Sequence, residues 1–315
     1  MFIQIILIIV GFILLIKGAD ILVEGSSQIA KKLHISEIII GLTIVSIGTS
    51  MPELFVSITS AMEGYSDMSV GNIIGSNICN LLLILGLSSI IRPVTFKKQT
   101  KLLENPMSII FSIIFFVICN INDDINRTEG IFLIILFVLF LIYTITIALR
   151  SQRNKTILKL EETKKISFIK NVMLIILGIT ILKLGGDFVV YNAKMVAITL
   201  KVSEKVIGLT IVAIGTSLPE LVTSITAAIK EDSDIAIGNI VGSNIFNMLL
   251  IIGVAALITP IKYNVTYNLQ MVVLFIAMIL MLIYPFIKPK NQLTRWKGLI
   301  FVLLYIAYMI ELIIK

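Results

Sequence analysis

Ten stretches of the chain are each long and apolar enough to cross a lipid bilayer, and this pattern constrains the fold more than any other feature of the sequence. A spanning helix needs about 20 mostly apolar residues, because the hydrocarbon core is about 30 Å thick and each helical residue rises about 1.5 Å. The sequence therefore predicts an all-α integral membrane protein with ten transmembrane helices. The expected spans are Phe2 to Ala30, Ile38 to Ala61, Met68 to Ile91, Met107 to Ile121, Gly130 to Leu149, Phe168 to Leu200, Val206 to Ile229, Ile235 to Ile258, Leu269 to Ile287 and Gly298 to Ile314.

The composition excludes several other classes of protein. Apolar residues make up 57% of the 315 residues and charged residues only 14%, and the mean hydropathy is +1.04, which rules out a water-soluble globular domain. The single histidine, His34, cannot build a histidine-rich metal site. The two cysteines, Cys79 and Cys119, cannot form a disulfide framework.

The basic residues are distributed unequally between alternate loops. With ten spans, 18 lysines and arginines lie on one side and 5 on the other, and the richer side is expected to be cytoplasmic. Both termini are then extracytoplasmic, in a multi-pass protein of the cell membrane. Residues 150–167 form a basic cytoplasmic linker between two halves, 1–149 and 168–315. The net charge of +7 is thus explained by the lysines and arginines of the cytoplasmic loops, and we expect no nucleic-acid partner.

Two long segments of the chain repeat each other. Residues 41–86 and 208–253 align without a gap at an offset of 167, and 30 of their 46 positions are identical. Five predicted spans separate each helix from its counterpart, and because five is odd, the two copies cross the membrane in opposite directions. The prediction is therefore two inverted five-helix repeats, an arrangement typical of secondary transporters whose sites lie near the bilayer midplane.

Each repeat contains a proline that is expected to break its helix beside a glutamate. Pro52 has no backbone N–H, so the carbonyl of Gly48 loses its helical partner and needs another ligand. Thr49 and Ser50 lie four and three residues before Glu53, so they share its helical face. Thr216, Ser217, Pro219 and Glu220 repeat this arrangement in the second half.

The following span of each repeat adds further oxygen donors. Ser76 and Asn80 are four residues apart, as are Ser243 and Asn247. Carboxylate, hydroxyl, amide and carbonyl oxygens suit hard cations such as Ca²⁺ and Na⁺. Two buried glutamates would be neutralised by one Ca²⁺, by two Na⁺ or by two protons, so exchange among these ions is electrostatically natural. The asparagines could instead only bridge helices, and the hydroxyls could only pack or bond their own helix.

At this point the motifs resemble a known family. The paired GTSxPE and GNxxGSNIxN segments are similar to the two alpha repeats of the cation/Ca²⁺ antiporter superfamily, specifically prokaryotic Na⁺/Ca²⁺ exchangers. The resemblance implies that Glu53 and Glu220 are the central ligands and that spans one and six slide past the core bundle. Some microbial relatives have Asp at the position of Asn247. The remaining ligands implied by the resemblance are Thr49, Ser50, Ser76, Asn80, Thr216, Ser217, Ser243, Asn247 and the backbone carbonyls of Ser46 and Ala213.

The sequence therefore predicts an antiporter that exchanges Na⁺ for Ca²⁺, with three Na⁺ for one Ca²⁺ favoured by the resemblance. Ca²⁺/H⁺ exchange at the same two glutamates is the nearest alternative; an ion channel and a non-transporting membrane scaffold are more distant ones. An ATP-driven pump is disfavoured, because the chain has no phosphate-binding loop and no soluble domain to hold one. We expect no enzymatic activity, no cofactor and no obligatory protein partner. Asp20 and Asp187, which interrupt spans one and six, are interpreted as local helix caps or interfacial residues.

Overall fold

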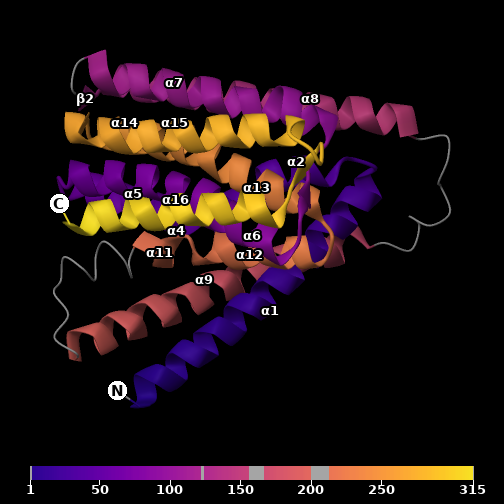
Figure 1. Ribbon diagram of the computed structural model, residues 1–315, viewed down its shortest axis with the longest axis horizontal. Coiled ribbons are helices and arrows are strands. Elements are labelled where there is room, and N and C mark those ends of the chain that lie inside the picture. Colours follow the sequence, from indigo (N-terminus) through magenta and orange to yellow (C-terminus); the bar gives the residue numbers. More distant parts are fainter. Residues whose placement is uncertain (1, 122–123, 156–166, 200–212, 315) are drawn as a thin grey trace.

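The computed structural model describes residues 2–121, 124–155, 167–199 and 213–314, and its regular structure is almost entirely helical. Most helices run side by side in a bundle. Helices α1 (Phe2–Leu33) and α9 (Phe168–Thr199) lie obliquely along one side of it, and α7 (Asn105–Ile121) and α8 (Arg127–Lys155) lie on the opposite side (Figure 1).

The remaining elements follow the repeat. In the first half they are the α-helices α2 (Glu37–Ile40), α3 (Ser46–Thr49), α4 (Met51–Met62), α5 (Ser66–Ile78) and α6 (Leu85–Ile91), the π-helices η1 (Gly41–Val45), η2 (Cys79–Ile84) and η3 (Thr100–Glu104), and the strands β1 (Val94–Thr95) and β2 (Asp124–Ile125). In the second half they are α11 (Ala213–Thr216), α12 (Leu218–Ile229), α13 (Ser233–Ile245), η6 (Phe246–Ile251), α14 (Ile252–Ile258), β3 (Ile261–Lys262), η7 (Val265–Tyr267), α15 (Asn268–Ile283), η8 (Tyr284–Phe286), β4 (Gln292–Leu293) and α16 (Arg295–Ile314).

Seven helices among the described residues are long and apolar enough to cross a membrane, and the bent pair of segments Glu37–Thr49 and Met51–Met62 makes an eighth. The chain is therefore a multi-pass helical membrane protein. The expected span at 206–229 falls partly in residues 200–212, which lie outside the described part. The expected span at 298–314 corresponds to α16, a 20-residue helix that carries Arg295, Lys297 and Glu311. The count of ten stays a prediction.

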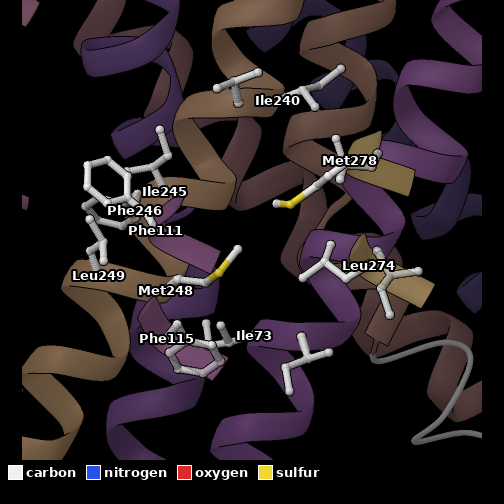
Figure 2. Packing of buried hydrophobic residues seen from close by; sticks show 14 of the residues in the cluster. Ile73, Phe111, Phe115, Ile240, Ile245, Phe246, Met248, Leu249, Leu274 and Met278 are labelled. Atoms are coloured by element: carbon white, nitrogen blue, oxygen red, sulfur yellow. The ribbon is translucent and has the colours of Figure 1, made fainter. Parts of the chain in front are cut away.

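The two spans that carry the second motif of each repeat form the centre of the bundle. The span Ser66–Ile91 is 78% buried within the protein and Ser233–Ile258 is 83% buried, whereas the most apolar part of α1 is only 28% buried. Figure 2 shows how outer helices cover them: Phe115 of α7 and Met278 of α15 pack around Ile73 and Met248. The polar residues of the central spans are thus kept away from lipid by a surrounding apolar layer.

Glycines bring the backbones of α1 and α9 into direct contact. Gly11, Gly18 and Gly25 recur at every seventh residue of α1. A Cβ atom on Gly18 would lie 2.8 Å from the backbone nitrogen of Leu182 and 3.0 Å from the carbonyl oxygen of Gly178. Both distances are to backbone atoms, so any larger residue would force the helices apart. The two oblique helices, one from each half, therefore form a closely packed antiparallel pair.

Two sequence expectations about the spans were wrong. Helices α1 and α9 run without a break through Asp20 and Asp187, so the interpretation of these aspartates as helix caps is wrong, and an interfacial position stays a prediction. The carboxylate oxygen Oδ1 of Asp20 instead forms an ion pair with Nζ of Lys230 at 2.5 Å, and Lys230 lies at the turn between α12 and α13. The fourth span begins at Thr100 rather than Met107, because the π-helix η3 joins α7 directly. The expected fifth span, Gly130 to Leu149, lies within helix α8, whose apolar part is Arg127–Ile147.

Two short ladders tie the loops of the two halves together, and one buried lysine fastens a loop of the second half. Strand β1 pairs with β4 and β2 pairs with β3, both antiparallel, so each ladder joins a first-half loop to a second-half loop. The buried ammonium of Lys297 donates to the carbonyl oxygens of Tyr284 (2.8 Å), Ile287 (2.9 Å) and Gln292 (2.9 Å). Lys297 thus fastens the segment between α15 and α16 by binding three of its backbone carbonyls.

Candidate functional site

Both proline motifs interrupt their helices at the same place. Helix α3 ends at Thr49, Ser50 adopts a non-helical conformation (φ −84°, ψ 11°), and α4 begins at Met51; the segments before and after this break are inclined by 46°. In the second half α11 ends at Thr216, Ser217 has φ −87° and ψ 7°, and α12 begins at Leu218. The prediction of a helix break at each motif is confirmed, and the break places each glutamate in the first turn of a new helix.

The two glutamates are buried and each is held by the opposite half. Glu53 and Glu220 are both 1% exposed. Ser50 Oγ donates a hydrogen bond to Glu220 Oε1 at 2.7 Å, and Ser217 Oγ donates to Glu53 Oε1 at 3.2 Å. Ser76 Oγ, on the central span of the first half, also donates to Glu53 Oε1, at 3.4 Å. The bonds of Ser50 and Ser217 cross between the repeats, so the two broken helices meet at one cluster.

The other candidate ligands lie at the same breaks. Thr49 Oγ1 donates to the carbonyl oxygen of Ser46 at 3.4 Å and to Asn239 Oδ1 at 3.0 Å, and its hydroxyl is a neighbour of the Glu220 carboxylate. Thr216 is buried and interacts with Glu53 in the equivalent way. Ala213 is the first residue of α11, three residues before Thr216.

Several oxygens of the cluster have no hydrogen-bond donor. Glu53 Oε2, Glu220 Oε2, Asn80 Oδ1, Asn247 Oδ1 and Ser243 Oγ are buried and have no partner among the described residues. Leaving a buried polar atom without a partner costs about 1 to 3 kcal/mol, and more for a charged group. Four of the five atoms can only accept, so each of these four needs a donor or a cation as its partner.

No positive side chain compensates the glutamates within the described residues. The ion pairs there join Arg92 to Glu231, Lys97 to Asp234 and Lys230 to Asp20, all away from the cluster. Even on the lenient scale measured by membrane insertion, a charge at the bilayer centre costs about 2.5 to 3.5 kcal/mol. Two adjacent buried carboxylates therefore require added positive charge, and oxygen ligands without sulfur or imidazole favour hard cations.

Four asparagines hold the cluster together, and the sequence analysis did not single them out. Asn72 Nδ2 donates to Ser57 Oγ at 3.0 Å and to the backbone oxygen of Glu53 at 3.4 Å. Asn239 makes the same two contacts, to Ser224 and to the backbone of Glu220, at the same distances. Asn77 Nδ2 donates to the backbone oxygen of Asn244, and Asn244 Nδ2 donates to the backbone oxygen of Asn77. The available signal was that all four are identical, polar positions of the repeat inside apolar spans.

The comparisons with known proteins agree with one another. The family model described as sodium/calcium exchanger protein matches residues 3–146 and 170–314. Inner membrane protein YrbG of Escherichia coli (strain K12) is 38% identical, over 87% of this chain and 87% of that protein. Sodium/calcium exchanger MaX1 of Methanosarcina acetivorans is 30% identical, with 97% of each chain covered.

Solved structures show the same similarity. A structure of the sodium-calcium exchanger NCX_Mj, soaked with Na⁺ and Ca²⁺, is 35% identical in sequence. It superposes with a TM-score of 0.82 over 97% of each chain. The all-helical fold and the arrangement of the helices are therefore those of a protein that has been studied as an ion exchanger.

Proposed function

Since this chain belongs to the sodium/calcium exchanger protein family, a family of transporters, we propose that it is a secondary active antiporter that exchanges Na⁺ for Ca²⁺ by alternating access. The observation that carries the proposal is the buried pair Glu53 and Glu220, each bonded by a serine of the opposite repeat and surrounded by oxygens that lack donors. One Ca²⁺ balances the two charges, and Na⁺ at the same oxygens would displace it.

The transport site in this proposal is the ligand set expected from the sequence. It comprises the side chains of Thr49, Ser50, Glu53, Ser76, Asn80, Thr216, Ser217, Glu220, Ser243 and Asn247, with the backbone carbonyls of Ser46 and Ala213. Their support is the burial of the hydroxyl, amide and carboxyl groups at the two helix breaks.

The path of alternating access is proposed to run along α1 and α9. These helices pack on each other through Gly18 and Gly178, and much of their remaining surface is exposed to lipid. Ile179 and Val190 of α9 also press on Gly48 and Gly215, where a Cβ atom would lie 2.4 Å and 2.3 Å from them. A displacement of α1 and α9 would therefore move the side chains that contact Gly48 and Gly215, which lie directly before the two helix breaks.

The membrane arrangement completes the proposal. We propose ten spans in two inverted five-helix repeats, with residues 150–167 in the cytoplasm and both termini outside the cell. Single cysteines introduced at residues 65–67 and 150–165 test it with a membrane-impermeant thiol reagent in intact cells. The first segment should react from outside and the second only after permeabilisation. Reaction of both segments from one side would contradict the inverted arrangement.

The counter-ion is decided by flux measurements. In proteoliposomes, an outward Na⁺ gradient should drive uptake of radiolabelled Ca²⁺, whereas a pH gradient of equal size should not. Uptake driven only by the pH gradient would identify Ca²⁺/H⁺ exchange at the same glutamates instead. Uptake that needs no counter-ion and does not saturate would indicate a channel.

The proposed stoichiometry is three Na⁺ for one Ca²⁺. With two carboxylates the site is neutral when it holds one Ca²⁺ and carries one positive charge when it holds three Na⁺, so each cycle moves one net charge. Transport would then respond to the membrane potential at about 2.3 kcal/mol per 100 mV. A potential imposed with K⁺ and valinomycin should change the reversal point, after K⁺ transport itself has been excluded. Exchange indifferent to voltage, with a Hill slope near two for Na⁺, would contradict this ratio.

A further inference from the structure

Four asparagine side chains connect the two central spans in a closed set of hydrogen bonds. Asn247 Nδ2 donates to Asn77 Oδ1 at 3.0 Å, and Asn80 Nδ2 donates to Asn244 Oδ1 at 2.9 Å. Asn77 Nδ2 donates to the backbone oxygen of Asn244 at 3.3 Å, and Asn244 Nδ2 donates to that of Asn77 at 3.4 Å. All four residues are at most 1% exposed.

The direction of every bond in this set follows from its two backbone carbonyls. An amide group is ambiguous by itself, because its oxygen and nitrogen ends have nearly the same shape and only the partners decide between them. A backbone carbonyl can only accept, so Asn77 must turn its nitrogen toward the carbonyl of Asn244. Its oxygen then faces Asn247 and can only be met by a donor. Asn247 must therefore present its NH₂ group to Asn77.

The same hydrogen bonds determine which side-chain amide atom of Asn247 and of Asn80 remains without a partner. With each NH₂ group engaged, the two remaining amide atoms are Asn247 Oδ1 and Asn80 Oδ1, the buried oxygens that have no partner in the described part of the chain. If either amide were reversed, an NH₂ group with a partial positive charge would replace that oxygen. A reversed amide would repel a cation where the present one attracts it.

We propose that Asn77 and Asn244 are positioning residues that orient the amides of Asn247 and Asn80, so that two neutral oxygens face the cation bound at Glu53 and Glu220. This inference rests on the proposed function, since it takes those glutamates as the transport site. The arrangement adds ligands without adding charge, so the site keeps the two negative charges that one Ca²⁺ balances. Asn77 and Asn244 themselves do not touch the ion.

A double-mutant cycle tests this role against simple adhesion between helices. We would measure the dissociation constant of radiolabelled Ca²⁺ on the purified full-length protein in detergent, together with its thermal midpoint. Asn77→Ala should weaken Ca²⁺ binding about tenfold, because Asn247 is then free to reverse. In an Asn247→Ala background the same substitution should change the affinity less than twofold, since no amide remains to be oriented.

A matched control uses the asparagine that Asn77 does not bind. In an Asn80→Ala background, Asn77→Ala should keep its full, about tenfold effect on Ca²⁺ affinity. An equal effect in all three backgrounds, or an unchanged affinity of a folded Asn77→Ala protein, would overturn the proposal. A lowered thermal midpoint with unchanged affinity would show that Asn77 acts only as a contact between helices.

The repeat supplies a second, independent cycle. The effect of Asn244→Ala on Ca²⁺ affinity should be lost in an Asn80→Ala background, just as the effect of Asn77→Ala is lost in an Asn247→Ala background. The proposal can therefore still be tested if one of the variants does not fold. Wild-type protein that binds no Ca²⁺, or whose Ca²⁺ is not displaced by Na⁺, would contradict the proposed function itself. Normal wild-type binding with additive cycles would contradict only the role of Asn77 and Asn244.

Discussion

The two repeats build the buried cluster with nearly the same bonds, and the partners cross between the halves. Ser50 of the first half bonds the glutamate of the second, and Ser217 of the second half bonds the glutamate of the first. Asn77 and Asn244 cross in the same way. The duplication has therefore not produced two separate sites, because each glutamate accepts a hydrogen bond from a serine that lies more than 160 positions away in the sequence.

The halves differ in how their glutamates are bonded. Glu53 accepts from two serines, Ser217 at 3.2 Å and Ser76 at 3.4 Å. Among the described serines, Ser50 donates to Glu220, at the shorter distance of 2.7 Å, while Ser243, the counterpart of Ser76, has no hydrogen-bond partner in that part of the chain. A sequence repeat of 30 identities in 46 positions thus still gives two unequal carboxylates. Substitutions made in matched pairs measure how much this inequality matters.

The largest effect is expected from removing either charge. Glu53→Gln and Glu220→Gln should each lower Na⁺-driven Ca²⁺ uptake at least about 100-fold, because one remaining carboxylate cannot balance a divalent ion. Uptake into proteoliposomes measures this, with size-exclusion chromatography and the thermal midpoint as controls for folding. Wild-type exchange in either variant would remove that glutamate from the site.

The serine pair should reveal the inequality. Ser50→Ala removes the short hydrogen bond from Ser50 to Glu220. After Ser217→Ala, Glu53 still accepts a hydrogen bond from Ser76. A hydrogen bond to a charged group is worth about 1.5 to 3 kcal/mol. We expect about tenfold weaker apparent Ca²⁺ affinity for Ser50→Ala and about threefold for Ser217→Ala, measured as the half-saturating concentration in uptake. Equal losses of Ca²⁺ affinity would mean that the two carboxylates contribute equally to Ca²⁺ binding.

A carboxylate at position 247 should make the halves differ further. Asn247 Nδ2 now meets the acceptor Asn77 Oδ1, so an ionised aspartate there would place two acceptors face to face. We expect Asn247→Asp to hold a proton at neutral pH, which restores the donor, and to bind Ca²⁺ within about threefold of wild type. Comparing both proteins from pH 6 to pH 9 should show an added alkaline transition in the variant. Parallel pH profiles would contradict this expectation.

The smallest effect is expected at the turns that precede the central spans. Gly64 (φ 82°) and its counterpart Glu231 (φ 67°) both adopt the left-handed conformation. Gly64→Ala should lower the free energy of unfolding by about 1 kcal/mol, because alanine is strained there. Glu231→Ala keeps a strain already present and loses only an exposed ion pair with Arg92, so its cost should be smaller. Ion affinity should not change, and thermal unfolding measures the difference.

Sequence reasoning was most accurate where the cause is local. A proline without an N–H breaks its helix wherever it occurs, so the breaks at Pro52 and Pro219 could be predicted, and the serine, threonine and glutamate of each motif do lie at them. The same local reasoning failed for Asp20. A short polar residue favours a cap, but close packing of Gly18 against α9 keeps α1 helical, and Lys230 pairs with the carboxylate.

The crossed contacts could not be predicted because their partners are set by the packing of distant helices. Ser50 and Glu220 are 170 positions apart, and no spacing along one helix links them. Asn77 was overlooked for a related reason: its own face of α5 suggests only a contact between helices. Its importance lies in the direction of a bond to Asn247, which is visible only once the carbonyl of Asn244 is placed opposite it.

The glycine contacts between α1 and α9 have a consequence for the cell's energy supply. If these helices slide as proposed, they must do so together, because Gly18 and Gly178 leave no room for one backbone to ride over the other. A single moving body occupies one position at a time, so it can open the path to one face of the membrane only as it closes the other. Ions then cannot run straight through the protein down their gradients, because no continuous path joins the two faces of the membrane at any moment.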